Sequence, residues 1–238
     1  PKTGGTTFKA HLERYLSWDE QLVEFSDWGR RYRAERELAE FADRPEEVRS
    51  RAVVLAGHRL SYGAHRIVPG ERDVRYITFL RDPAERCVSL YNFRKSRGTT
   101  EADFMSWYRD DFLAHNRNSI VGFYASRTLP PEMMVDEGTR TQAARALLER
   151  CWHVGFTDRL SASLDFLCAE FGIPAEWTNQ RVAGSGERLK SPSHPSDGEM
   201  IARHVTLSAE LRAQIYADRP EDLALYEWAR KAFGTTHD

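Results

Sequence analysis

The sequence has little cysteine and no long apolar run, and each shortage excludes a class of protein. Only three of the 238 residues are cysteine, and Cys87, Cys151 and Cys168 show no CxxC spacing and lie in apolar stretches. They predict buried, reduced thiols rather than disulfides or a metal site, so we expect a reducing compartment. No apolar run of about 18 residues is present, and no signal peptide is visible.

The sequence also lacks an excess of either charge, since 34 basic residues balance 36 acidic ones to a net charge of −2. A nucleic-acid-binding protein would carry a marked basic excess, so we expect no nucleic-acid partner. Lysine accounts for only five of the basic residues, a skew typical of a GC-rich bacterial genome. With 41% apolar residues, we expect residues 1–238 to form a single domain around one core.

The chain opens on Pro1-Lys2-Thr3-Gly4-Gly5-Thr6-Thr7-Phe8, a glycine turn that a lysine precedes and two threonines follow. Adjacent glycines allow a tight turn with several N–H groups pointing inward, and the start of the following helix adds unpaired donors. Lys2 supplies a full positive charge, and Thr6 and Thr7 supply hydroxyl donors. The pattern predicts a phosphate-binding loop. In a Walker A loop, by contrast, the lysine follows the glycines.

A second motif begins at Tyr76 and predicts a strand that leads directly into a helix. Tyr76 to Leu80 is an apolar, β-branched run typical of a buried strand. Asp82, Pro83 and Glu85 then fit the N-cap, the first and the third positions of a helix.

Arg81 therefore lies at the carboxyl end of the predicted strand, beside a helix N-terminus, and Ser89 lies two turns into that helix. A guanidinium and a hydroxyl at these places can bind one phosphate group together. The sequence thus predicts two separate anion sites, one at the opening loop and one at Arg81 and Ser89.

Together the two motifs resemble the nucleotide signatures of sulfotransferases, and in detail those of the carbohydrate sulfotransferases of the heparan sulfate 2-O and 6-O type. In that family a Pro-Lys-Thr-Gly-x-Thr loop binds the 5′-phosphosulfate of the donor, 3′-phosphoadenosine 5′-phosphosulfate (PAPS). An Arg-Asp-Pro motif, with a serine eight residues after the arginine, binds its 3′-phosphate. The resemblance implies binding of the 5′ end by Lys2, Thr3, Gly4, Gly5, Thr6 and Thr7, and of the 3′ end by Arg81 and Ser89. It is strong over residues 1–12 and 76–93, and weaker at 56–58, 153–160 and 222–226.

Strands and helices alternate along the rest of the chain. Strands are predicted at Ala52–Ala56, Tyr76–Leu80 and Trp152–Phe156. Helices are predicted from Phe8 to Leu16 and from Trp28 to Phe41, and at Pro83–Lys95, Glu101–Leu113, Thr141–Glu149, Arg159–Phe171, Ser208–Tyr216 and Pro220–Phe233. This alternation predicts an α/β fold whose parallel sheet is covered by helices on both faces, and the resemblance implies that it is of the P-loop type.

A phosphate loop needs a strand leading into it, and the sequence shows none before Pro1. We therefore expect that the sequence is a fragment cut just after a first strand, which the resemblance makes central to the sheet. The absence of a visible leader or membrane anchor is therefore only weak evidence about the compartment. We expect the bacterial cytoplasm, or the Golgi lumen if a eukaryotic anchor was removed.

Histidine is the side chain best suited to take a proton from a sugar hydroxyl near neutral pH. His58 follows the strand Ala52–Ala56 after Gly57, and it matches the catalytic histidine of the family, so we expect it to be the general base. His65, seven residues later, is its local competitor. The resemblance gives Lys2 the role of stabilising the leaving oxygen. We expect no metal, because a sulfuryl group carries less negative charge than a phosphoryl group.

The segment from Arg181 to Gly198 is rich in glycine, serine and proline, yet it contains Arg181, Arg188 and Lys190. Two interpretations stay open. It is either a mobile surface loop or, as the resemblance implies, a basic flap over the 3′-phosphate and the adenine of the donor.

Two other functions also stay open. A P-loop kinase-like phosphotransferase would use a similar cradle but needs an acidic residue to hold its metal, and the lysine-first order argues against it. A non-catalytic module that binds a nucleotide or a glycan is the second alternative. For the sulfotransferase, the expected partner is a glycan or another acceptor that bears a hydroxyl group.

Overall fold

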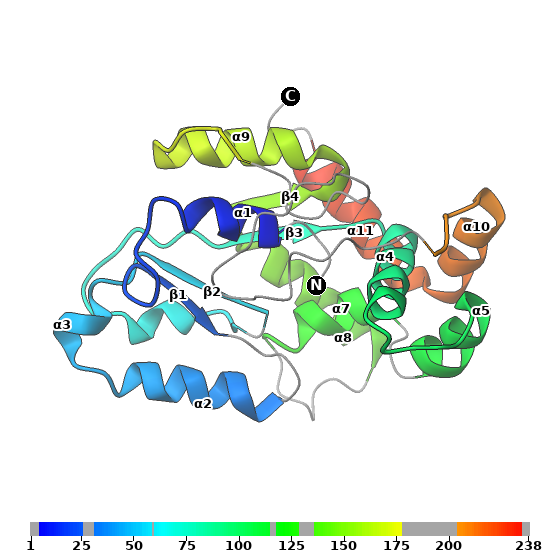
Figure 1. Cartoon of the computed structure of the whole chain (residues 1–238), viewed down its shortest axis with the longest axis horizontal. Helices are drawn as coiled ribbons and strands as arrows, with labels where there is room; N and C mark the ends of the chain where they lie inside the picture. The colour runs from blue at the N-terminus through cyan, green and yellow to red at the C-terminus, as the bar shows by residue number, and fades with distance from the viewer. Residues whose placement is uncertain are drawn as a thin grey trace.

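The structure is a computed structural model that describes residues 5–25, 31–58, 60–114, 118–128, 136–177 and 204–234, with the backbone alone at residues 6 and 31–35. This part of the chain is mixed α/β, with helices packed around two small parallel sheets (Figure 1). None of its helices combines the length and the apolar character needed to cross a membrane.

The strands form two parallel pairs. β1 (Leu22–Phe25) pairs with β2 (Val54–Gly57), and β3 (Ile77–Leu80) pairs with β4 (His153–Phe156). The sequence predicted that the strands near residues 54 and 77 belong to one sheet. In the described residues they belong to different pairs, and β1 was not predicted at all.

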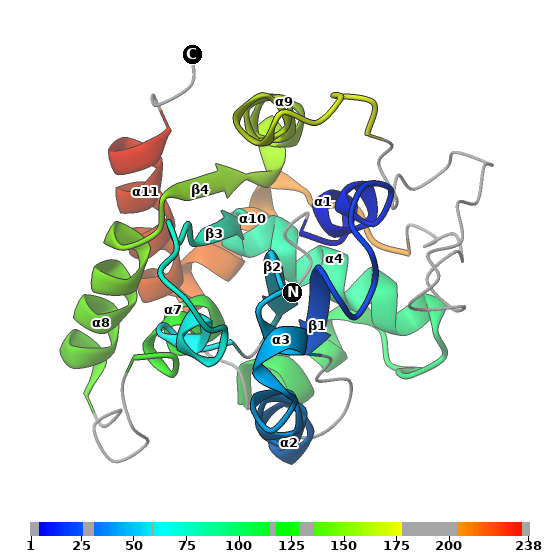
Figure 2. The same ribbon diagram turned by 90° about the vertical axis from the view of Figure 1, so that its left-hand side faces the viewer.

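One face of both sheets is covered by the same two helices, α1 (Gly5–Leu12) and α9 (Leu160–Phe171) (Figures 1 and 2). Because side chains alternate along a strand, every second residue of each strand points to this face. The result is one apolar cluster that joins the two sheets, and its buried members are Phe8, Leu12, Leu22, Phe79, Leu164 and Leu167. Val54 and Ala56 of β2 and Ile77 of β3 pack against it.

Different helices cover the opposite faces. The β1–β2 pair packs on α2 (Arg31–Ala42) and the 3-10 helix η1 (Ala64–Ile67), while α3 (Glu46–Arg49) leads into β2. The β3–β4 pair packs on α7 (Ser119–Ala125), α8 (Glu137–Glu149) and α11 (Pro220–Phe233). The prediction that helices cover both faces is therefore confirmed for each pair of strands.

A further cluster lies to one side of the strands (Figure 1). It contains α4 (Pro83–Ser96), α5 (Phe104–Ser106), the π-helix Trp107–Leu113 and α10 (Ala209–Asp218). Aromatic rings dominate this cluster, with Tyr91, Phe104, Trp107, Tyr108 and Phe112 all buried.

Capping residues explain where the helix boundaries agree with the sequence and where they do not. The predicted starts at Pro83 and Pro220 are confirmed. The helix expected from Glu101 begins instead at Phe104, because the Asp103 carboxylate accepts hydrogen bonds from the backbone N–H groups of the next turn. The helix expected from Thr141 begins four residues earlier, because Asp136 caps it through the Thr139 N–H at 2.7 Å.

A charged network is buried where α4, α7 and α11 meet. Arg219 and Asp222 are fully buried and form an ion pair, and Asp222 Oδ1 accepts from the N–H groups of Ile120 and Val121 at 2.9 and 2.8 Å. Asp222 therefore caps α7 from another helix. Burial lowers the pKa of Arg86, as does the neighbouring Arg219, and the charge of Asp222 opposes this.

Removing the carboxylate of Asp222 should be strongly destabilising. In Asp222→Asn the buried guanidinium of Arg219 loses its counter-charge, and we expect the free energy of unfolding to fall by about 3–5 kcal/mol. The matched control is Asp111→Asn, which breaks an exposed ion pair with Arg94 and should cost less than about 1 kcal/mol. Similar losses in the two variants, measured by chemical denaturation, would contradict this account.

Glu221, in the first turn of α11, is a second acidic residue with an unusual environment. Burial and the neighbouring Glu137 raise its pKa from the ordinary 4.5 to about 7. A raised carboxyl pKa means that the folded protein holds the proton more tightly than the unfolded chain. The stability that this contributes is therefore complete at acidic pH and is lost as the pH rises toward the folded pKa.

Glu221→Gln should therefore become more stable relative to the natural protein as the pH rises. We expect the difference in free energy of unfolding to grow from about pH 4.5 to about pH 7 and then level off. Denaturant unfolding across this range measures it. A difference that does not change with pH would show that Glu221 titrates normally in the folded protein.

Candidate functional site

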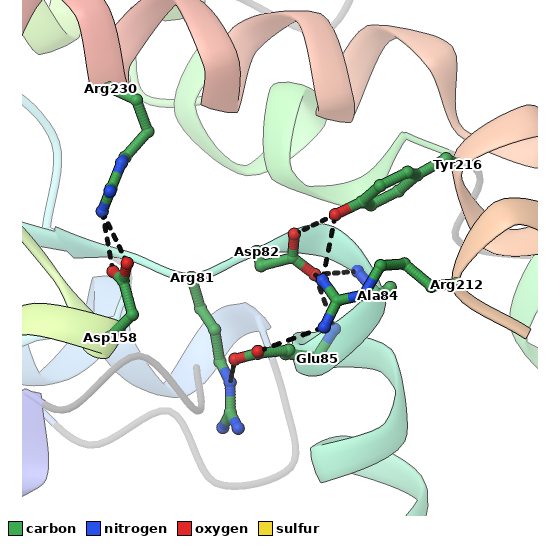
Figure 3. Close-up of polar contacts among 8 residues, drawn as sticks. All are labelled: Arg81, Asp82, Ala84, Glu85, Asp158, Arg212, Tyr216 and Arg230. Atoms are coloured by element: carbon green, nitrogen blue, oxygen red, sulfur yellow. Dashed lines mark hydrogen bonds and ion pairs between the residues drawn. The ribbon is translucent and has the colours of Figure 1, made fainter. Parts of the chain in front are cut away.

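The candidate site lies at the carboxyl end of the β3–β4 pair (Figure 3). Leu80 of β3 is paired with Phe156 of β4, so the residues that follow each strand emerge at the same edge. Arg81 follows β3, and the 3-10 helix η4 (Thr157–Arg159) follows β4. Asp158 of η4 binds one terminal nitrogen of Arg230 with both carboxylate oxygens, at 2.8 and 2.7 Å.

Asp82 fixes the start of α4. Its Oδ1 accepts from the N–H groups of Ala84 and Glu85 at 3.0 and 2.9 Å, as the predicted N-cap should. The same carboxylate is held from α10, because Tyr216 donates its hydroxyl to Oδ2 and Arg212 Nη1 lies 3.1 Å from Oδ1. Asp82 therefore joins α4 to α10 (Figure 3).

Arg81 lies beside this cap and is mostly buried. Its Nε is 3.7 Å from Glu85 Oε2, and the other oxygen of Glu85, Oε1, is 3.4 Å from Arg212 Nη2. Burial lowers the pKa of Arg81, while the carboxylates of Glu85 and Asp82 oppose the shift. A hydrogen bond with Tyr216 raises the pKa of Arg212, and both arginines remain charged at neutral pH.

Ser89 is half-buried and follows Glu85 by four residues on α4, as Glu85 follows Arg81. Residues at this spacing occupy one side of a helix. Ser89 and Glu85 therefore lie on one side of α4, and the Glu85 carboxylate faces Arg81, which precedes the helix.

His58 is exposed and directly follows β2, which ends at Gly57, as the sequence predicted. Helix α7 connects this strand end to α4, the helix that follows β3. Arg86 of α4 donates to Ser119 Oγ at the start of α7 at 2.7 Å, and Arg127, just beyond its end, donates to the backbone carbonyl of His58.

The competing histidine, His65, has a structural contact. Its Nδ1 lies 2.7 Å from the hydroxyl of Tyr76, which also accepts from the Gly63 N–H. His153 is buried against Phe166, and His11 bonds the Pro174 carbonyl at 2.7 Å. His204 approaches Ser96 on the surface, whereas His115, His194 and His237 lie outside the described residues.

The opening loop is described only from Gly5 onward. Gly5 is exposed at the first described position of α1, and a Cβ built there meets no described atom within 4 Å. Thr7 is buried, and the Thr6 side chain is not described. The other predicted donor ligands lie outside the described residues: Lys2, Thr3, Gly4, Arg181, Arg188 and Lys190.

Sequence reasoning missed Arg212 and Tyr216, although it predicted their helix. The two are four residues apart, and an arginine and a tyrosine at this spacing share one side of a helix. That spacing was the available signal. Their partners, Asp82 and Glu85, lie more than a hundred residues earlier in the chain, so no local pattern could supply the contact.

No protein family model matches the chain, and no curated protein matches it in sequence. Across the described ranges, no three histidine, cysteine, aspartate or glutamate side chains gather as metal ligands.

Proposed function

We propose that the protein is a sulfotransferase that moves a sulfuryl group from PAPS to a hydroxyl group, with a carbohydrate as the acceptor. One observation carries the proposal. Arg81 follows the end of β3 beside the capped N-terminus of α4 and faces Glu85, and Ser89 lies one turn after Glu85 on that helix.

This arrangement suits a phosphate that anchors a ligand. The start of α4 carries the positive end of its dipole, Arg81 adds a full charge, and Ser89 adds a hydroxyl. Glu85 would repel an anion here, but Arg81 and Arg212 both contact it and balance its charge. The 3′-phosphate of PAPS is the group that the resemblance assigns to these residues.

For the 5′ end, the support comes from the start of α1. The N–H groups of Gly5 and Thr6 belong to the first described turn of α1, and backbone N–H groups at the start of a helix can bind an anion. The space beside the Gly5 Cα is open within the described residues, so a ligand can approach the backbone closely. The resemblance assigns Lys2, Thr3 and Gly4 to the same end of PAPS.

The chemistry requires a base for the acceptor. In the proposed reaction the acceptor oxygen forms a bond to sulfur, and the bond between sulfur and the 5′-phosphate oxygen breaks. The imidazole of His58 takes the acceptor's proton, and 3′,5′-bisphosphoadenosine leaves with the bonding electrons. This role is supported by the exposure of His58 and by α7, which links the end of β2 to α4, the helix that begins just after Arg81.

Two anion sites predict that the full-length protein binds 3′,5′-bisphosphoadenosine more tightly than AMP. The additional phosphate makes charge-assisted contacts of about 1.5–3 kcal/mol each, so we expect a difference of about tenfold or more by calorimetry. Arg81→Ala should remove most of this difference, whereas the control Arg94→Ala, elsewhere on α4, should preserve it. Equal affinity of the unaltered protein for the two ligands would overturn the proposal.

Replacing His58 should affect turnover far more than binding. We expect His58→Ala to lower kcat by about 10²–10⁴-fold with 3′,5′-bisphosphoadenosine affinity unchanged, the usual effect of losing a general base. His65→Ala should instead cost about 1 kcal/mol of stability, through the lost bond to Tyr76, and little activity. Donor binding without any turnover, over a panel of sugar acceptors, would favour the non-catalytic module.

A further inference from the structure

We infer that Arg127 is a positioning residue for His58, whose backbone it ties to the C-terminal end of α7. The inference rests on the proposed function for the role of His58 as the general base. The contact itself lies between Arg127 and the chain that leaves β2, whatever reaction takes place there.

The end of β2 is held on one side by β1. Gly57, the last residue of β2, is paired with Phe25, the last residue of β1. A Cβ added at Gly57 would lie 2.7 Å from the Phe25 carbonyl oxygen and 3.3 Å from the Phe25 Cβ. Because glycine alone allows this approach without a shift, the backbone just before His58 lies close against β1.

On leaving β2, the chain meets the guanidinium of Arg127. Its Nη2 donates to the His58 carbonyl, and its Nη1 donates to the carbonyl of Phe123 in the last turn of α7. The guanidinium also lies over the Phe123 ring, 3.4 Å from the ring centroid. One side chain therefore joins the end of α7 to the candidate base.

Helix α7 is a firm anchor for this contact, because other elements hold it along its length. Asp222 of α11 caps its first turn, and Arg86 of α4 donates to Ser119 Oγ at its start. The Tyr124 hydroxyl, near its end, lies 2.9 Å from Thr78 Oγ1 on β3. Arg127 therefore ties His58 to a helix that contacts β3, the strand that leads into the phosphate-binding motif.

An arginine suits this position because its terminal nitrogens are separate donors in fixed directions. Nη1 and Nη2 of Arg127 serve carbonyls on two different elements. A lysine has one nitrogen and cannot make both bonds with the same geometry. The contact thus depends on the shape of the Arg127 side chain as well as on its charge.

The position of His58 matters because a general base acts only within hydrogen-bonding reach of the proton that it takes. The His58 side chain is exposed, so its backbone contacts have a large share in placing its ring. A misplacement of about 1 Å can cost about 10²-fold in rate. Loss of Arg127 should therefore slow the chemical step and leave donor binding unchanged.

Steady-state kinetics of the full-length protein test the inference, with PAPS and the sugar acceptor that the unaltered protein sulfates. Arg127→Ala should lower kcat about 10–100-fold, while the acceptor KM and the affinity for 3′,5′-bisphosphoadenosine stay within about twofold. An unchanged kcat would overturn the inference. So would a raised acceptor KM with kcat unchanged, since Arg127 would then bind the acceptor directly.

Two variants separate positioning from losses of stability and of charge. Arg72 likewise joins two segments, through the carbonyls of Pro69 and Ala52 at 3.2 Å each, but before the start of β2. Arg72→Ala should lower the unfolding midpoint about as much as Arg127→Ala does and leave kcat unchanged, and an equal loss of kcat would mean that instability is responsible. Arg127→Lys keeps the charge, and its kcat should stay closer to that of Arg127→Ala than to that of the unaltered protein. Full activity in Arg127→Lys would mean that only the charge matters.

The ring signals of His58 in NMR, identified by their absence in His58→Ala, give a readout without any substrate. They should differ between the unaltered protein and Arg127→Ala, and stay unchanged in Arg72→Ala. Identical signals in Arg127→Ala would overturn the positioning role whatever the reaction is. If the signals differ while the unaltered protein sulfates no acceptor, the positioning role stands and the proposed function fails.

Discussion

The carboxylate of Asp82 is the constraint on which the candidate site depends. One oxygen caps the first turn of α4, and both oxygens are held by Arg212 and Tyr216 of α10. Because Asp82 lies between the end of β3 and Pro83, it fixes the direction in which the chain leaves the strand. The place of Arg81, one residue earlier, follows from that direction. A single capping interaction therefore determines both a helix boundary and the location of a charged ligand-binding candidate.

The apolar core holds the two separate strand pairs together. α1 and α9 bury side chains from both pairs in a single cluster, so the pairs share one packed face. Elsewhere, α7 connects α4 to the end of β2 through Arg86 and Arg127. Arg81 follows β3, and His58 follows β2. Both strands pack with α1 in this cluster, although no described strand joins the two pairs.

The predictable parts of the fold were those with local signals. Asp82 followed by Pro83 gave the start of α4, and Pro220 gave the start of α11. β1 was missed because it is only four residues long and includes Glu24, whose charge is paired in the fold by Lys9 of α1 at 2.6 Å. The sequence placed Arg81, Ser89 and His58 at strand ends or on the following helix. It could not reveal the contacts of Glu85, since those with Arg212 depend on how α10 packs.

The N-terminus of α4 lies between two charged networks, and one segment of the chain supplies residues to both. In the more exposed network, Asp82 and Glu85 pair with Arg212 of α10. In the buried network, Arg86 lies near the charges of Arg219 and Asp222. Arg212, Arg219 and Asp222 of these networks all come from 212–222, where α10 passes into α11 through a buried arginine. The inner network tolerates little change, because an unpaired buried charge is costly, whereas the outer one is half-exposed and adjustable. The buried side therefore keeps α4 in place, and a change on the exposed side should cost little stability.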